Sequence, residues 1–502
     1  PGARAFVLAG LAARSDAPLL AVVPGEQEAR DLADDLALFI EQVAHLPAWE
    51  TLPFEHVSPN TTTMAARSKA RHLLATAPAG TVVVAPVRAV IQRVAPSDPT
   101  PLHVEVGTTE PFDGLVNRLA ALGYERTERV EHRGEFAVRG GIIDVYPVDG
   151  GTAARLDFWG DDIDSIREFD PSSQRSEGAV ALLEVHPARE LRLDAELSSR
   201  AAALRETQPW NQSTWDLIAE GHTFDGVESW LPWLAPEQSV LDDHDGPLVI
   251  FEPTQALARA KDLAAEERDL AEALAPTWGT GSPDAGETPP LYLDLESRVA
   301  GRPALLAPSL AAGPDDARLE SRPLGATPGE PEELVRAITA LRAEKVQTIL
   351  SMDGAAAADR VVRILADEGL ALDRLEMVDA GESGVVGHGV NLGFVLPGLG
   401  VAVLGEQEIA GRRRAHRPVG RTRATDTSVG YRDLVPGDHV VHHRHGVGRL
   451  EGLVTREIAG VERDNLVVAK AGEDRLDKPT DQFAGNDRNT GGEQPPLSRM
   501  GG

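Results

Sequence analysis

The first 107 residues alternate short apolar runs with segments of helical periodicity. The runs from Leu19 to Val23 and from Thr81 to Ala85 predict buried strands. Between them, the leucines from Glu26 to Ile40 recur at helical spacing, with acidic residues on the outer face. Because strands that alternate with helices usually form a parallel sheet, residues 1–107 are predicted to be an α/β domain.

From Gly134 to Asp170, single apolar and polar residues alternate, which is typical of half-buried strands. The pattern predicts three strands, at residues 142–146, 155–159 and 163–169. Glycine-containing turns separate them, at Gly140-Gly141, Gly150-Gly151 and Gly160-Asp161-Asp162. We therefore expect residues 108–183 to form a strand-rich module that follows a short helix at Leu115 to Leu122.

The middle strand of this module predicts an exposed face suited to binding. Side chains alternate across a strand, so Leu156 and Phe158 are expected to face the core. Arg155, Asp157 and Trp159 then share the opposite face. Tryptophan and arginine are strongly enriched at interface hot spots. A cation–π pair on an ordinary surface is the alternative that the local chemistry leaves open.

Residues 184–295 return to mixed structure and contain a Trp-rich stretch, FDGVESWLPWL. A strand is predicted at Leu248 to Phe251 and a helix at Gln255 to Leu274. A Gly-, Pro- and acid-rich linker is expected from Gly279 to Pro290.

Residues 325–408 predict a second α/β domain. Its expected elements are a strand at Val346 to Met352, a helix at Ala355 to Asp367 that Gly369 caps, and strands at 375–379 and 400–406.

The end of the chain predicts a linker, a small β-barrel and a polar tail, residues 489–502. The linker, residues 409–432, holds six arginines between Arg412 and Arg423, which could contact phosphates or simply belong to a flexible connection. The barrel is expected at residues 433–488, with a glycine-rich corner at Gly446-Val447-Gly448. Four histidines stand close together there, but zinc usually needs ligands from two elements, so packed or solvated side chains are expected: His439, His442, His443 and His445.

Composition narrows the function classes. The chain has no cysteine, which excludes disulfides, thiolate metal sites and a cysteine nucleophile. The formal net charge of -30 repels nucleic acid on average, so any DNA contact must be local. We find no signal-peptide pattern and no apolar run of membrane-spanning length, and we expect a cytoplasmic protein with no membrane partner.

The α/β segments invite a nucleotide-binding interpretation, but the phosphate-binding chemistry is missing. A P-loop needs a Gly-Lys pair followed by Ser or Thr, and no Gly-Lys dipeptide occurs in the chain. The position where such a loop could stand reads Pro1-Gly2-Ala3-Arg4-Ala5. Gly398-Leu399-Gly400 precedes a predicted strand rather than a helix, and Asp367-Glu368 lies at a helix end, a poor position for magnesium. We therefore expect no cofactor and no catalytic residue in this chain.

Five segments in order resemble the bacterial transcription-repair coupling factor (Mfd) family. LPAWETLPFEHVSPN resembles the family's first domain, and GEFAVRGGIIDVYPV with RLDFWGDDIDSIREFDPSSQRS resembles the second. FDGVESWLPWL resembles the third segment, and GHGVNLGFVLPGLGVAVLGEQEIAGRR the end of the next domain. DLVPGDHVVHHRHGVGRLEGLV resembles the RNA polymerase-interacting domain.

The resemblance implies UvrB-like, helicase-like α/β domains that have lost their nucleotide site, with a β-rich insert, followed by a CarD/Tudor-like barrel. The implied domains are residues 1–107 and 184–295 as two parts of the UvrB-like domain, 108–183 as the UvrA-binding module, 325–408 as an α/β domain, and 433–488 as the polymerase-interacting barrel. The family's UvrA-binding residues fall on Arg139, Arg155 and Trp159. The implied contacts to the polymerase β subunit fall on Leu453, Thr455, Arg456 and Ile458.

Two departures from the family pattern concern the end of the chain. Asn465 and Asp477-Lys478 stand where the family's barrel usually carries aromatic residues. The family continues into an ATP-driven DNA translocase, which accounts for its ATP and magnesium and most of its DNA contacts, whereas this chain ends at LSRMGG. We therefore expect an adaptor that binds stalled RNA polymerase and recruits UvrA for nucleotide excision repair. The alternatives are a nucleotide-dependent UvrB-like repair enzyme and a CarD-like transcription regulator.

Overall fold

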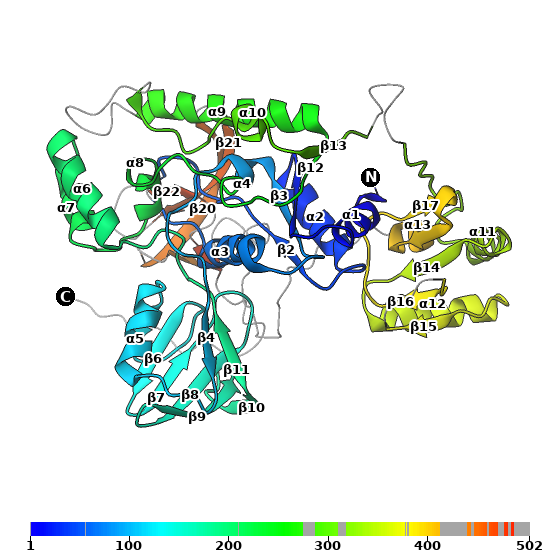
Figure 1. Cartoon of the computed structure of the whole chain (residues 1–502), viewed down its shortest axis with the longest axis horizontal. Coiled ribbons are helices and arrows are strands. Elements are labelled where there is room, and N and C mark those ends of the chain that lie inside the picture. The colour runs from blue at the N-terminus through cyan, green and yellow to red at the C-terminus, as the bar shows by residue number, and fades with distance from the viewer. Residues whose placement is uncertain are drawn as a thin grey trace. The chain divides into compact units, whose positions relative to one another are not determined.

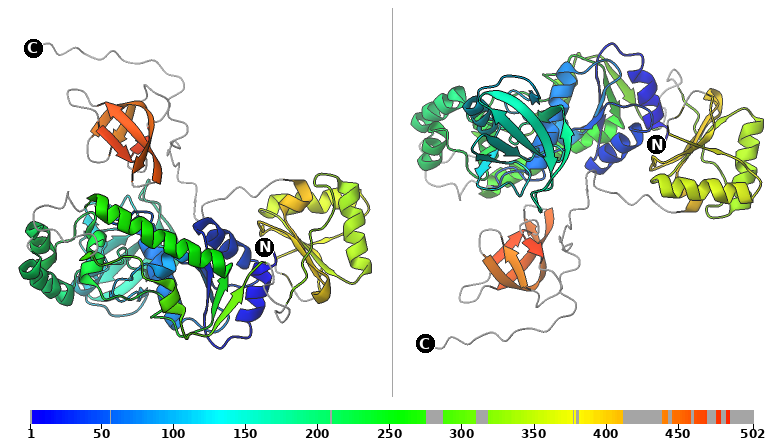
Figure 2. Two further views of the ribbon diagram at one scale, coloured as in Figure 1. Left: turned by 90° about the horizontal axis from the view of Figure 1, so that it is seen from above. Right: turned by 90° about the horizontal axis from the view of Figure 1, so that it is seen from below.

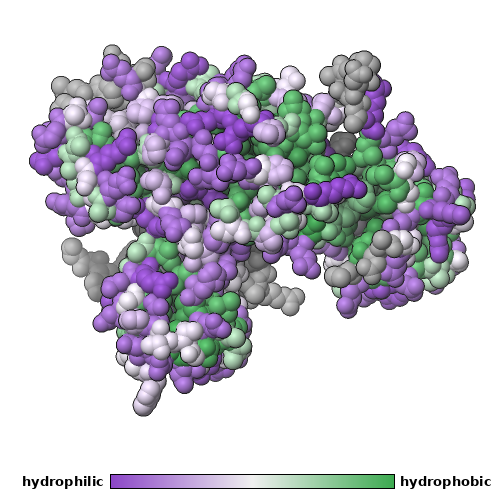
Figure 3. Space-filling model, in the orientation of Figure 1, coloured by the Kyte–Doolittle hydropathy of each residue, from purple (hydrophilic) through white to green (hydrophobic). Residues whose placement is uncertain are grey.

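The computed structural model describes residues 2–55, 57–208, 210–274, 287–309, 318–376, 378, 381–411, 439–442, 446–458, 461–469, 476–479 and 483–485 (Figure 1). The chain divides into two compact units, Pro1–His416 and Arg417–Gly502. Among the helices of the described residues, none combines the length and the hydrophobicity that a membrane span requires. Hydrophilic side chains cover much of the face shown in Figure 3, with hydrophobic residues gathered in patches between them.

A five-stranded parallel sheet forms the centre of the first α/β domain. Its order is β13 (Ala304–Ala307), β12 (Leu248–Phe251), β1 (Leu19–Val23), β3 (Val82–Pro86) and β2 (Val43–His45). Each neighbouring pair is parallel, as the alternation of strands and helices predicts. Strands from both ends of the first 310 residues share this sheet.

Helices pack against this sheet. Helix α1 (Arg4–Ala12) and helix α2 (Glu26–Leu36) pack their apolar sides on β1, β3 and β12. Figure 2 shows the long helix α9 (Pro253–Leu274), in green, running along the outside of the unit. The remaining helices of this domain are α3 (Thr61–Thr76), α4 (Val87–Ile91), α6 (Ala195–Thr207), α7 (Gln212–Ala219), η1 (Val227–Trp230), α8 (Leu231–Leu234) and α10 (Leu295–Val299).

Helix α2 ends at Leu36, so the prediction that it continues to Ile40 was wrong. The amides of Phe39 and Ile40 both donate to the Leu36 carbonyl, which tightens the chain into a turn. This turn brings Phe39 against Phe6 and the second α/β domain, with ring centroids of Phe6 and Phe39 5.7 Å apart. Packing between domains therefore overrides the local helical periodicity.

The insert domain is a six-stranded sheet in the order β10 (Ser176–Val180), β9 (Asp162–Phe169), β8 (Ala153–Trp159), β7 (Ile142–Val145), β6 (Glu135–Arg139) and β5 (Glu125–Thr127). Helix α5 (Phe112–Ala121) packs on its apolar face. The chain enters through β4 (Leu102–Glu105) and leaves through β11 (Leu182–Val185), which pair antiparallel. This pairing holds the two ends of the insert side by side.

The second α/β domain has a five-stranded sheet in the order β15 (Asp373–Leu375), β16 (Gly384–Val386), β14 (Gln347–Ser351), β18 (Val401–Leu404) and β17 (Phe394–Leu396). Its helices are α11 (Pro331–Ala343), α12 (Ala355–Asp367), α13 (Glu406–Ala410) and the short η4 (Pro397–Leu399).

Two expectations for this domain have different outcomes. Gly369 caps α12 as predicted, with φ of +84° and a hydrogen bond from the Leu370 amide to the Leu365 carbonyl. The strand expected at 375–379 lies earlier, at Asp373–Leu375, where it pairs with β16, and residues 377, 379 and 380 lie outside the described residues.

The second unit is a five-stranded antiparallel sheet in the order β22 (Leu476–Pro479), β21 (Val461–Ala469), β20 (Gly446–Ile458), β19 (His439–His442) and β23 (Phe483–Gly485). Gly446-Val447-Gly448 is not the expected corner, because it pairs with β19 as the start of β20. Among the described strands, β22 and β23 do not pair with each other, so the predicted closure into a barrel stays a prediction. His443, His445, the linker from 412 to 432 and the tail 489–502 lie outside the described residues.

A buried carboxylate joins the insert domain to the first α/β domain. Glu190, just beyond the insert, accepts hydrogen bonds from Arg67 at 2.6 and 3.2 Å and from the Trp49 indole at 2.9 Å. The Arg67 and Glu190 side chains are 0% and 1% exposed. Removing one member of a buried ion pair leaves the other charge without compensation, which is costly.

Replacing Glu190 with Gln should therefore lower the free energy of unfolding by about 3–5 kcal/mol. The matched control is Glu266→Gln, which removes a carboxylate from an exposed pair with Arg259 at 3.0 Å and should cost at most about 1 kcal/mol. Urea denaturation followed by tryptophan fluorescence measures both. Equal destabilisation by the two variants would contradict the role assigned to Glu190.

Candidate protein-docking surface

Trp159 stands at the tip of the β8–β9 hairpin. Trp159 and Asp162 pair across a two-residue turn, in which Gly160 has φ of +65°. A positive φ at the first turn position favours glycine and suits the twist of a hairpin. Trp159 is 83% exposed, which is more than any other large hydrophobic residue among the described residues.

The backbone beneath Trp159 is held in place by the segment that leads into α5. The Glu110 amide donates to the Asp161 carbonyl at 2.8 Å, and the Phe112 amide donates to the Asp161 side chain at 3.1 Å. Thr109 Oγ1 donates to Asp162 at 2.6 Å. The indole is therefore presented by an anchored turn, which reduces the conformational entropy that binding would remove.

Arg155 and Arg139 share one carboxylate on the same face. Arg155 donates through Nε and Nη2 to the two oxygens of Asp144, at 2.7 and 2.9 Å, and Arg139 Nη2 donates to Asp144 Oδ2 at 3.3 Å. The Arg155 guanidinium also lies over the Phe169 ring, 4.8 Å from its centroid. The hydrogen bonds to Asp144 raise the pKa of Arg155 above its ordinary value, so the side chain keeps its charge.

The geometry corrects the expectation that Arg155 and Trp159 share an exposed face. Arg155 does not stand in solvent beside Trp159, because its pairing with Asp144 leaves the side chain only 17% exposed. Arg139 lies on β6, and β7 lies between β6 and β8. The alternation on β8 is confirmed, since Leu156 is buried and Phe158 packs edge-on against Phe112 while Trp159 is exposed.

Asp144 is the residue of this face that sequence reasoning missed. It is 2% exposed and occupies the third position of the strand Ile142–Val145, next to Ile143 and Val145. A lone acid within an apolar strand was the available signal, because a buried carboxylate needs hydrogen-bond or charge partners.

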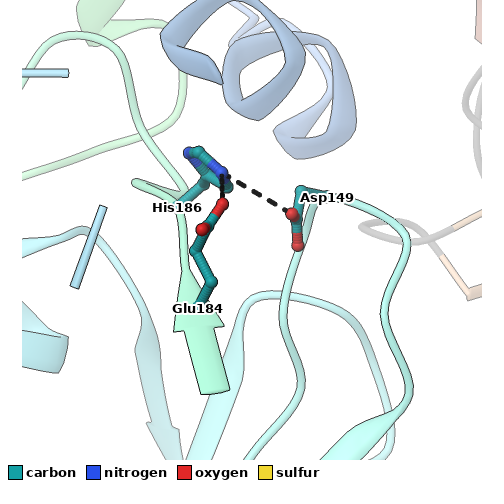
Figure 4. A group of neighbouring side chains, drawn as sticks. All are labelled: Asp149, Glu184 and His186. Atoms are coloured by element: carbon teal, nitrogen blue, oxygen red, sulfur yellow. Dashed lines mark hydrogen bonds and ion pairs between the residues drawn. The ribbon is translucent and has the colours of Figure 1, made fainter. Parts of the chain in front are cut away.

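A second group of titratable side chains lies where α3 meets the insert domain. The His186 Nε2 atom lies 2.6 Å from Glu184 Oε1 and 3.7 Å from Asp149 Oδ2 (Figure 4). Burial lowers the pKa of His186, although the charge of Asp149 opposes the shift. The three groups lie within 4.8 Å of one another and contain the donor types that a divalent cation uses.

Two features of this group disfavour a metal. The ammonium of Lys69, on α3, already lies 3.4 Å from Asp149 and supplies positive charge. The His186 Nδ1 atom is buried with no hydrogen-bond partner among the described residues, whereas a metal-bound histidine usually donates from its second nitrogen. We interpret the group as a polar contact between α3 and the insert domain.

The positions considered for nucleotide binding lack the required geometry. A Cβ added to Gly2 would lie 2.7 Å from the carbonyl oxygens of Leu392 and Gly393, so the start of α1 is packed against backbone. The glycines around Leu399 lead through η4 into β18, and Asp367 is the last residue of α12, as predicted.

The residues assigned to polymerase binding all lie on β20. Leu453, Thr455, Arg456 and Ile458 pair with β21. Among the described strands, β19 pairs with β20 only from Gly446 to Arg449. The far half of β20 therefore has an edge that no described strand occupies, which is the arrangement that strand addition requires.

Comparison with known proteins matches both regions to families. The UvrB interaction domain matches residues 102–191, and the CarD-like/TRCF RID domain matches residues 434–484. The first match encloses the module expected at 108–183. A comparison with the crystal structure of Cryptosporidium parvum pyruvate kinase gives a TM-score of 0.12 at 11% identity, covering 87% of this chain and 97% of that one, and carries no argument.

Curated relatives match along the whole chain. The transcription-repair-coupling factor of Mycobacterium bovis is 34% identical, with 100% of this chain and 44% of the relative covered. The Myxococcus xanthus protein of the same name is 30% identical, with 99% and 46% covered, and the Escherichia coli protein is 28% identical, with 99% and 45% covered. The chain thus spans a little under half the length of these relatives. It belongs to the transcription-repair coupling factor family.

Proposed function

We propose that this chain is a two-ended adaptor that connects stalled RNA polymerase to nucleotide excision repair. The insert domain binds UvrA through Trp159, Arg139 and Arg155, and the second unit binds the polymerase β subunit through β20. DNA translocation driven by ATP belongs to the parent family and not to the residues described here. The anchored, exposed Trp159 is the single observation that carries the proposal.

Energetics favour this face as a docking site. A tryptophan buries about 150–250 Å² when it enters a pocket, and an exposed indole on a rigid turn loses little conformational freedom on binding. Arg139 lies on the same face of the sheet, and its side chain is 49% exposed. An aromatic anchor and an arginine on one face are the composition typical of interface hot spots.

The polymerase end rests on backbone geometry. The far half of β20 forms a ribbon with β21, and Arg456 and Arg463 pair directly across it. An edge strand offers unpaired amide and carbonyl groups to a partner strand, which gives affinity through main-chain hydrogen bonds. The match of residues 434–484 to the CarD-like/TRCF RID domain supports the same partner.

The double variant Arg139→Ala with Trp159→Ala should weaken binding of purified UvrA by on the order of 2–4 kcal/mol, because it removes both anchors. Isothermal titration calorimetry measures the loss. Arg129→Ala is the matched control, since the Arg129 side chain is also 49% exposed and ion-paired in the same domain. UvrA binding that survives the double variant unchanged would show that the surface is wrongly assigned.

Arg456→Glu should weaken binding to the polymerase β subunit about tenfold or more, because it reverses a charge on the proposed edge. The control is Arg463→Glu, which makes the same change on the paired strand and should have a smaller effect. Surface plasmon resonance with immobilised β subunit separates the two. A larger loss from Arg463→Glu would place the contact on β21 instead.

Deleting residues 433–488 should abolish polymerase binding and leave UvrA affinity within about twofold, since sites without shared partners behave additively. Pull-downs with each partner test the separation. Loss of both activities, with the rest of the chain still folded by circular dichroism, would contradict a two-ended adaptor.

A further inference from the structure

Asp144 connects the two arginines of the docking surface, and no sequence feature assigns it a role in binding. Its carboxylate is 2% exposed and uses one oxygen for Arg155 Nε and the other for Arg155 Nη2 and Arg139 Nη2. A buried carboxylate in this position fixes the direction of two flexible side chains at once.

Strand register explains how one residue reaches both partners. Asp144 lies directly opposite Arg155 on β8 and directly opposite Ala137 on β6. Arg139, two residues beyond Ala137, is the diagonal neighbour of Asp144 on the same face. The small Ala137 side chain leaves room for Arg139 to extend toward the carboxylate.

The arrangement also fixes the net charge of this cluster of three side chains. Two guanidinium groups and one carboxylate leave a single net positive charge, on a chain whose formal net charge is -30. Without Asp144, Arg155 would keep the Phe169 ring beneath it but would lose its two hydrogen bonds to the carboxylate. Its guanidinium would then sample other rotamers, and partner binding would have to order it again.

We propose that Asp144 is a positioning residue that pre-organises Arg155 and Arg139 for binding UvrA. This inference rests on the proposed function of the insert domain. Asp144 does not touch the partner and acts only through the two arginines. Its contribution to affinity therefore depends on their presence, whereas a purely structural residue would affect stability in any background.

The test is a mutant cycle on UvrA affinity in the full chain. Asp144→Asn should weaken binding about tenfold, mainly through faster dissociation, because the arginines remain but are no longer held. In the Arg139→Ala/Arg155→Ala background, the same change should alter affinity less than about twofold. In a Trp159→Ala background, it should keep its tenfold effect, because the indole is not hydrogen-bonded to Asp144.

Thermal unfolding supplies the readout that separates positioning from structure. In the Arg139→Ala/Arg155→Ala background, Asp144→Asn should raise the melting temperature, since it removes a buried carboxylate that has lost its partners, and yet should restore no binding. If Asp144→Asn fails to fold alone, Asp144→Glu keeps the charge, shifts both guanidinium groups and should weaken UvrA binding as well.

The outcomes distinguish this inference from the function on which it rests. If Arg155→Ala and Arg139→Ala weaken UvrA binding while folded Asp144→Asn and Asp144→Glu leave it within twofold, Asp144 is only structural and the inference is overturned. If neither the arginine variants nor Trp159→Ala weakens binding, the docking surface itself is overturned.

Discussion

The Glu190 carboxylate is the interaction on which the placement of the insert domain depends. Glu190 lies just beyond the insert in the chain. Its carboxylate accepts hydrogen bonds from Arg67 on α3 and from Trp49 in the loop before α3, and all three side chains are buried. The antiparallel pairing of β4 with β11 holds together the two segments through which the chain enters and leaves the insert domain. Because the base of the domain is held at both places, the hairpins at its far end can carry an exposed tryptophan on a rigid support.

The hairpin tips are rigid although Trp159 is exposed there, because backbone hydrogen bonds and glycine turns hold them. The β6–β7 and β8–β9 turns lie at one end of the sheet, and the Phe158 amide donates to the Gly141 carbonyl at 2.8 Å. Positive φ angles at Gly140 and Gly160 permit two-residue turns without steric strain. The domain thus packs its larger apolar core beneath one face, whereas the other face combines a small apolar cluster around Phe169 with the ion pairs of Asp144 and the exposed Trp159 indole.

The sequence was most informative where periodicity and burial agree. The helix Ala355–Asp367, the strand Leu248–Phe251 and the alternation on β8 were predicted from local pattern alone. The end of α2 was not, because Phe39 packs against the core of the second α/β domain. The contacts of Asp144 with Arg155 and Arg139 were not predicted either, since they depend on the register between neighbouring strands, which only the assembled sheet reveals.

The central claim is that the hairpin tips of the insert domain are the surface that UvrA covers. Hydrogen–deuterium exchange of the full chain, with and without saturating UvrA, tests this most directly. We predict slowed exchange in peptides spanning residues 136–145 and 155–165, with little change in α9 or in the second α/β domain. Unchanged exchange in those two peptides, with protection elsewhere in the chain, would contradict the claim.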